Sequence, residues 1–290
     1  MKRLYLVSTE HLENGLWFRD EEDFRVAMNY VAIQAAWYPE VVVLTFILMS
    51  NHAHFVLKGS REGVVAFINR FKHRYSIYYG KKYLVKEFLR GNGLDIRQIL
   101  TDNEGLEKAI AYVHMNCVAA GICAHPSQYE WGSGNSYFSY TKPSRRCLKE
   151  LTGRELTRLM HSRCHPFPDD WILGDEGYIL PESYVDVLTV ESVFRTPQRM
   201  NFFLRNSSRA RKKLESDVSA PAFRDQTIVS ALPDLCRSLF QKGTVAELLV
   251  EELSELARQI RFRFCSDATQ IARVCGISYS DVAKLLDDCT

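Results

Sequence analysis

The stretch Val41–Leu57, VVVLTFILMSNHAHFVL, consists of two apolar runs separated by a short polar insert. At the centre of the insert, His52 and His54 are one residue apart. Side chains alternate between the two faces of a strand, so both imidazoles would point the same way while Ala53 points to the other face. Their Cα atoms would be about 6.5–7 Å apart, which lets two ring nitrogens converge on one cation. An ordinary polar strand end is the alternative interpretation.

The composition is typical of a globular protein. Of the 290 residues, 46% are hydrophobic and 25% are charged, and the net charge is +2. This length is comfortable for two domains. No apolar run is long enough to span a membrane and the N-terminus lacks the apolar region of a signal peptide, so we expect a cytoplasmic location. The eight cysteines show no CxxC pair, and free thiols are expected.

Helical periodicity occurs on both sides of this stretch. Residues Glu21–Ala36 carry apolar side chains at helical spacing, and an acidic first turn suits the start of a helix. Residues Arg61–Tyr83 have a broad apolar stripe and a basic side interleaved with tyrosines. Such a side is typical of a phosphate-binding surface, with a solvated helix face as the alternative. The DNA contacts expected here are Arg70, Lys72, His73, Arg74, Lys81 and Lys82.

A third helix is predicted at Asn103–Gly121, where Asn103 suits the N-cap and Gly121 the C-terminal stop. Tyr112 and Asn116 are four residues apart and therefore share a side of this helix. His114 points elsewhere, and we expect it at the surface or in an interface.

Three short motifs follow one another within residues 1–140. They are MSNHAHFVL around the histidine pair, AYVHMN followed by VAAGI, and the YEW element at Tyr129–Trp131. In this order they resemble the single-tyrosine HUH transposases, which include the IS200/IS605-type enzymes and, more closely, the REP-associated tyrosine transposases. Relatives typically have proline where this chain has Ser50 and Cys117, and neither departure removes a group with chemistry.

The resemblance implies a metal-dependent enzyme that cleaves and rejoins single-stranded DNA. His52 and His54 would hold Mg²⁺ or Mn²⁺, Asn116 would complete or orient the metal shell, and Tyr112 would be the nucleophile. A tyrosine is only about a thousandth ionised at neutral pH, so a cation that polarises the scissile phosphate would assist its attack. Attack would leave a 5′-phosphotyrosine and a free 3′-hydroxyl for rejoining. The expected partner is single-stranded or hairpin DNA, and both a monomer and a homodimer stay open.

The fold implied is α+β, with a ferredoxin-like antiparallel sheet, helices on one face, and a mainly helical C-terminal extension. We expect an HUH nuclease domain at residues 1–140, a helical or irregular connecting region at 141–240 and a helix-turn-helix-like domain at 241–290. In the last, Gly276 would form the turn and Ser278 would cap the second helix. A second basic run adds three expected DNA contacts, Arg209, Arg211 and Lys212, with a solvated helix terminus as the alternative.

Two other functions stay open at this point. One is a sequence-specific DNA-binding regulator that keeps the nuclease fold without its activity. The other is an unrelated His-x-His metallohydrolase, which the lack of an Asp or Glu ligand soon after the pair disfavours. The presence of all four residues named for the site favours the enzyme.

Overall fold

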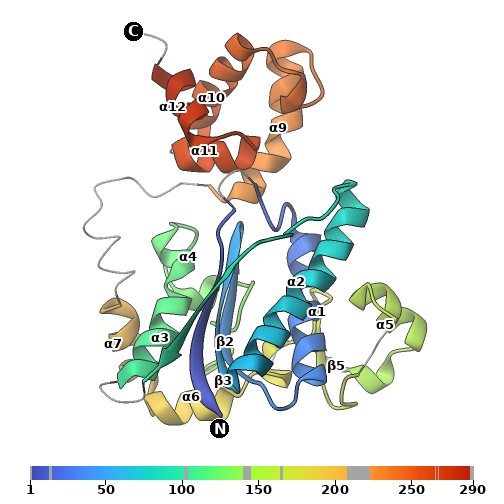
Figure 1. Ribbon diagram of the computed structural model, residues 1–290, viewed down its shortest axis with the longest axis vertical. Helices are drawn as coiled ribbons and strands as arrows, with labels where there is room; N and C mark the ends of the chain where they lie inside the picture. Colours follow the sequence, from blue (N-terminus) through green and yellow to red (C-terminus); the bar gives the residue numbers. More distant parts are fainter. Residues whose placement is uncertain are drawn as a thin grey trace.

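The computed structural model describes residues 2–12, 15–100, 104–139, 145–163, 166–207, 223–264, 266 and 268–287. At its centre is a four-stranded antiparallel sheet within an α+β fold (Figure 1). The strands are β1 (Arg3–Thr9), β2 (Val42–Met49), β3 (His52–Gly59) and β4 (Leu94–Ile99). They lie in the order β2-β3-β1-β4.

Helices connect the strands of the sheet, and further helices come after the sheet in the chain. Asp20 caps the first of them, α1, by accepting a hydrogen bond from Asp23 N, and Ser60 caps α2 in the same way. The helices associated with the sheet are α1 (Glu21–Trp37), α2 (Arg61–Tyr83), α3 (Gly105–His114) and the short α4 (Asn116–Ala119). The later ones are α5 (Gly153–Met160), α6 (Val187–Phe194), α7 (Pro197–Arg205), α9 (Asp225–Phe240), α10 (Val250–Phe264), α11 (Ala268–Cys275) and α12 (Tyr279–Asp287). A small sheet pairs β5 (Arg145–Cys147) with β6 (Ile172–Gly174), and 3₁₀ turns occur at Pro126–Gln128, Leu148–Glu150, Pro181–Ser183 and Val245–Glu247.

Alternation along β3 directs its side chains to two covered faces. The ring of Phe55 lies 5.8 Å from that of Phe71 in α2, measured between centroids. Its neighbour His54 points the other way, and its ring lies 5.6 Å from that of Tyr112 in α3. Helices therefore cover both faces, α1 and α2 on one side and α3 on the other (Figure 1). This corrects the prediction of helices on one face: β2 is buried along its whole length after Val42, so both of its faces need a cover.

The core consists of two separate hydrophobic clusters. The first contains buried residues from Tyr5 to Leu204, and the second contains residues from Ile228 to Val282 in α9–α12. The clusters therefore divide the chain between residues 204 and 228, and the predicted boundaries at 140 and 240 stay predictions. In the described part of the chain, no helix combines the length and apolar character that a membrane span requires.

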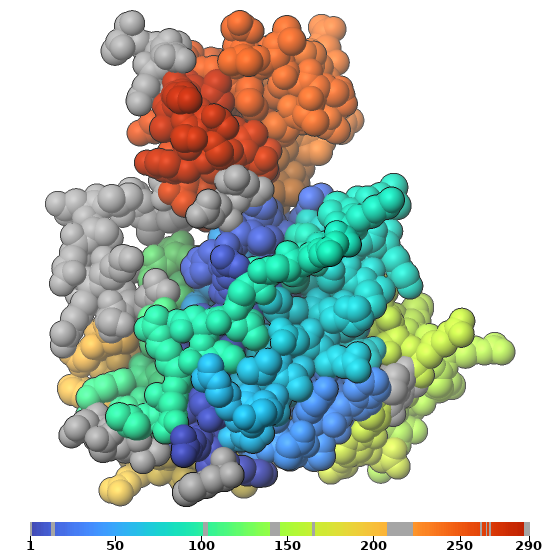
Figure 2. Space-filling view, viewed as in Figure 1, coloured from blue at the N-terminus to red at the C-terminus, as the bar shows by residue number. Residues whose placement is uncertain are grey.

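The helices α9–α12 form a compact body, which we call the C-terminal unit, beyond one end of the sheet (Figure 2). Gly276, with φ of +70°, lies in the short turn between α11 and α12. Ser278 Oγ accepts a 3.1 Å hydrogen bond from Asp281 N and so caps α12. The turn and the cap lie where the sequence predicted them.

His114 is buried in the core, whereas the sequence predicted a surface or interface residue. Its side chain is 2% exposed, and Nε2 lies 2.9 Å from Thr45 Oγ1 in β2. Burial lowers the pKa of His114 to about 3, and the nearby His125 adds to this. The imidazole is therefore neutral in the folded protein at ordinary pH.

The free energy of unfolding is expected to decrease as the pH falls below about 6.5, the usual histidine pKa. In this range the unfolded chain binds a proton at His114, whereas the folded protein does not bind it until the pH falls to about 3. Between these values, each unit of decrease in pH lowers the free energy of unfolding by up to about 1.4 kcal/mol. Urea denaturation of the wild type and of His114→Gln between about pH 7 and about pH 4 measures this. The variant should lose less stability over the interval, and equal losses would show that His114 is not the group responsible.

Candidate metal and nucleophile site

Three histidines converge at one end of the central strands. His52 and His54 belong to β3, and His11 follows β1. One ring nitrogen of each lies within 4.8 Å of those of the other two. The His11 and His52 rings stack with centroids 3.6 Å apart, and those of His52 and His54 are 4.7 Å apart. Because His11 is exposed and the other two are buried, the group is accessible from one side.

Hydrogen bonds orient the two buried imidazoles. His52 Nδ1 lies 2.8 Å from Asn51 Oδ1, and His54 Nδ1 lies 2.7 Å from Ser8 Oγ. The amide oxygen of Asn51 can only accept, so His52 carries its proton on Nδ1. Ser8 can accept in the same way from His54. In this tautomer Nε2 of each ring keeps the lone pair that can bind a metal ion, as in many metal-binding histidines.

The donor set suits a divalent transition metal. Three imidazole ligands leave coordination positions for a substrate oxygen and water. Transition-metal ions coordinate imidazole nitrogen well, whereas Mg²⁺ prefers oxygen ligands. The three histidines could therefore hold a metal ion, and of the two ions expected from the resemblance Mn²⁺ matches the set better than Mg²⁺.

Tyr112 approaches the histidines from α3. Its ring meets that of His54 edge-on, at an interplanar angle of 78°. Tyr112, His54 and His11 line one pocket of about 490 Å³, which Ser8 and Asp95 also border. The phenol and two of the three imidazoles therefore face the same space.

Asn116 lies at the start of α4, directly after the helix that carries Tyr112. Its Nδ2 donates to the carbonyl oxygens of Tyr112 at 2.9 Å and Val113 at 3.1 Å. These bonds connect the start of α4 to the last turn of α3. The role of Asn116 as a metal ligand stays a prediction.

His11 was not among the residues predicted for the site. The signal that could have found it is the pairing of β1 with β3, in which Ser8 lies opposite His54. Continuing that register beyond Thr9 takes the chain past His52. A histidine two residues after the strand can therefore reach the pair.

Two further charged residues on the Tyr112 side of the sheet were also missed. Asp95 and Arg97 alternate along β4, with Asp95 opposite Ser8, and they form an ion pair of 2.7 Å. The hydrogen bond to Asp95 raises the pKa of Arg97, and Tyr112 interacts with the same charge. Asp95 borders the pocket of Tyr112, so this ion pair lies near the phenol.

The basic residues predicted on α2 lie on the sheet face opposite Tyr112 and differ in exposure. Arg70, His73 and Lys81 are exposed, and the last two border a groove of about 610 Å³. Lys72 is buried: its Nζ donates to Asn92 O, and burial lowers its pKa. Arg74 is half-buried; it donates to Ser162 Oγ and lies over the Trp37 ring.

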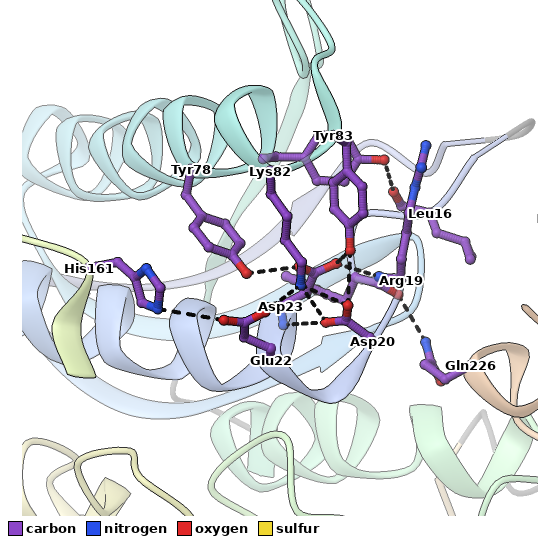
Figure 3. A network of polar contacts seen from close by, with 12 residues as sticks. Leu16, Arg19, Asp20, Glu22, Asp23, Tyr78, Lys82, Tyr83, His161 and Gln226 are labelled. Carbon is purple, nitrogen blue, oxygen red and sulfur yellow. Dashed lines mark hydrogen bonds and ion pairs between the residues drawn. The ribbon is translucent and has the colours of Figure 1, made fainter. Parts of the chain in front are cut away.

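Lys82 is held inside a network of acidic side chains (Figure 3). Its Nζ lies 2.7 Å from Asp20, 2.8 Å from Glu22 and 2.9 Å from Asp23. Burial alone would lower the pKa of Lys82, but the hydrogen bonds to the carboxylates raise it above its usual value. The ammonium group of Lys82 therefore faces the carboxylates at the start of α1 and not solvent. That of Lys72 likewise faces a backbone carbonyl of the protein. The other predicted contacts, Arg209, Arg211 and Lys212, lie outside the described residues.

No protein-family model and no curated protein matches this chain. Among solved structures, that of a REP-associated tyrosine transposase bound to a REP hairpin is similar to part of it. The sequence identity is 10% and the TM-score 0.35, and the match covers 60% of this chain and 87% of that one. A similarity of this degree assigns no function by itself.

Proposed function

We propose that this protein is a metal-dependent transposase of the single-tyrosine HUH type, which cleaves and rejoins single-stranded DNA at hairpin-containing ends. The observation that carries the proposal is the pocket shared by Tyr112, His54 and His11, in which a nucleophile lies beside a candidate cation site. The motifs around His52 and Asn116 support it. The antiparallel order β4-β1-β3-β2, with α1 and α2 on one face, supports a ferredoxin-like core.

In this proposal the chain supplies the nucleophile and the metal ligands. A bound divalent cation would neutralise charge on the scissile phosphate and polarise the phosphorus. Tyr112 Oη forms a bond to phosphorus as the bond to the 3′-oxygen breaks. The phenol proton is released, and the departing oxygen takes up a proton to become a 3′-hydroxyl. The 5′-phosphotyrosine keeps the phosphodiester energy, so attack by a 3′-hydroxyl reverses the step and rejoins the strand.

The exposed basic residues of α2 have a place in this proposal. Asn92 borders the groove of His73 and Lys81, and the next residue, Gly93, borders the pocket of Tyr112, so the two spaces adjoin at the start of β4. We propose that His73, Lys81 and Arg70 contact DNA phosphates beyond the cleavage point. Lys72 borders the same groove, but its ammonium group, like that of Lys82, binds oxygen atoms of the protein itself, so neither is included among these proposed contacts.

Cleavage is expected to require a divalent metal and the histidine triad. The substrates are single-stranded and duplex forms of the DNA that flanks the protein's own gene, with Mn²⁺ or Mg²⁺. We expect cleavage of the single strand, abolished by EDTA, and rates at least about 100-fold lower for His11→Ala and His52→Ala. His125→Ala, an exposed histidine that does not border the pocket, is the matched control. Cleavage that persists in EDTA would refute the metal role, and specific binding without cleavage would favour the regulator.

A further inference from the structure

The C-terminal unit extends to the candidate metal site. Gln226 Nε2 in α9 donates a 3.0 Å hydrogen bond to Phe18 O, which places the start of α9 against the segment before α1 (Figure 3). Next to this contact is a cleft of about 200 Å³, which we call the α9 cleft. His11 and His52 border it from the sheet, and Arg224 and Arg273 border it from the C-terminal unit. The unit therefore has its own core but forms part of the surroundings of the histidine triad.

The C-terminal side of the α9 cleft carries excess positive charge. Among the described residues that border it, Asp225 is the one acidic side chain, and it is buried. Its carboxylate accepts from Gln270 at 2.9 Å and from Nε and Nη2 of Arg273 at 3.2 and 3.3 Å. These bonds use one edge of the Arg273 guanidinium. Arg224 forms no ion pair with any described residue, so its charge is not neutralised there.

The size and lining of the cleft indicate the class of ligand. Pockets that enclose a complete small ligand are about 300–1,000 Å³, so about 200 Å³ suits a phosphodiester group and not a whole nucleotide. Guanidinium groups match the geometry of phosphate oxygens. Phe223, which is 42% exposed, borders the same cleft and offers an aromatic face to a base. Arginines beside an exposed aromatic ring are typical of single-strand binding surfaces.

We propose that Arg224 and Arg273 form a phosphate-binding subsite for the single strand, adjacent to the phosphate positioned at the histidine triad. The inference rests on the proposed function and gives the C-terminal unit a role in it. His11 borders both the α9 cleft and the pocket of Tyr112, so one strand can cross from one space to the other. Arg224 is then a positioning residue, because it binds the strand beside the reacting phosphate.

The test is equilibrium binding of a fluorescent oligothymidylate of about ten nucleotides. It uses the full chain with Tyr112→Phe in every variant and without divalent metal, so that no chemistry occurs. The variants are Arg224→Gln and Arg224→Lys. The matched control is Arg237→Gln, because Arg237 is a 68% exposed arginine of α9 that does not border the cleft.

Arg224→Gln is expected to weaken binding about five- to tenfold at low salt. It should also reduce the slope of log affinity against log salt by about 0.7, the value for one phosphate contact on a single strand. Arg224→Lys should keep the slope, since the charge is kept, and Arg237→Gln should change neither quantity. We expect equal melting temperatures for Arg224→Gln and the parent protein, because Arg224 forms no ion pair with a described residue. Equal values would confirm that the variants are folded.

If Arg224→Gln binds with unchanged affinity and salt slope, the proposed subsite is overturned. This holds even if the protein with Tyr112 intact forms a covalent adduct with DNA. An equal loss in Arg237→Gln would overturn it too, because it would show a diffuse effect of charge. Reduced binding in Arg224→Gln alone, together with no adduct in the unsubstituted protein, would retain the subsite and remove the nuclease proposal. The two proposals can therefore fail separately.

Discussion

Replacing Tyr112 by phenylalanine is expected to lower the rate of single-strand cleavage by at least about 1,000-fold, because the substitution removes the nucleophile. The phenyl ring keeps the edge-on contact with His54 and the same volume in the pocket. The free energy of unfolding and the affinity for single-stranded DNA should therefore change little. Single-turnover cleavage with Mn²⁺ measures the rate, and a binding titration without metal measures the affinity.

The matched control is Tyr279→Phe, which removes an exposed phenol from α12 and should leave the rate unchanged. A Tyr112→Phe protein that still cleaves in a metal-dependent way would indicate a metal-bound water as the nucleophile. That result would favour the metallohydrolase over the transposase.

Replacing Lys82 by methionine is expected to destabilise the fold by about 3 kcal/mol or more. Asp23 is fully buried and accepts hydrogen bonds from Lys82, from Tyr78 at 3.1 Å and from Tyr83 at 2.8 Å (Figure 3). Without Lys82, its carboxylate would remain buried beside that of Asp20 with no cation between them. Urea denaturation at neutral pH measures the loss.

Lys81→Met is the control, because Lys81 is adjacent and exposed. It should change the free energy of unfolding by no more than about 0.5 kcal/mol, while DNA binding falls. The bonds to Lys82 also lower the pKa of Asp20 against the opposing effect of burial, so its share of the stability is lost as the pH falls through the acidic range. The difference between the Lys82→Met protein and the wild type should therefore narrow at acidic pH. A Lys82→Met protein of normal stability but poor DNA affinity would instead support the original prediction for this residue.

The sequence was sufficient for the parts of the site that depend on local geometry. Alternation places His52 and His54 on one face of a strand whatever surrounds it, and both lie in β3 as expected. His11 could not be found in this way, because its position depends on the pairing of two strands that are far apart in the chain. The same limit applies to Arg224, which lies at the start of α9, a helix of the second hydrophobic cluster.

The basic side of α2 shows why charge patterns predict less than apolar ones. A helical period indicates the direction of a side chain but not the groups that it meets. Lys82 and Lys81 are neighbours in a basic run, yet α1 presents three carboxylates to the first, while the second borders an open groove. The burial of His114 has a similar cause. Its partner Thr45 belongs to β2, 69 residues earlier in the chain, so the contact depends on the tertiary fold.

Identification of a covalent adduct is the most direct measurement of the central claim. The protein is incubated with Mn²⁺ and single-stranded DNA from the flanks of its own gene, digested with protease and nuclease, and analysed by mass spectrometry. We expect a nucleotide joined through its 5′-phosphate to the peptide that contains Tyr112, and its absence from Tyr112→Phe. An adduct on a different residue, or cleaved DNA without any adduct, would contradict the assignment of Tyr112 as the nucleophile.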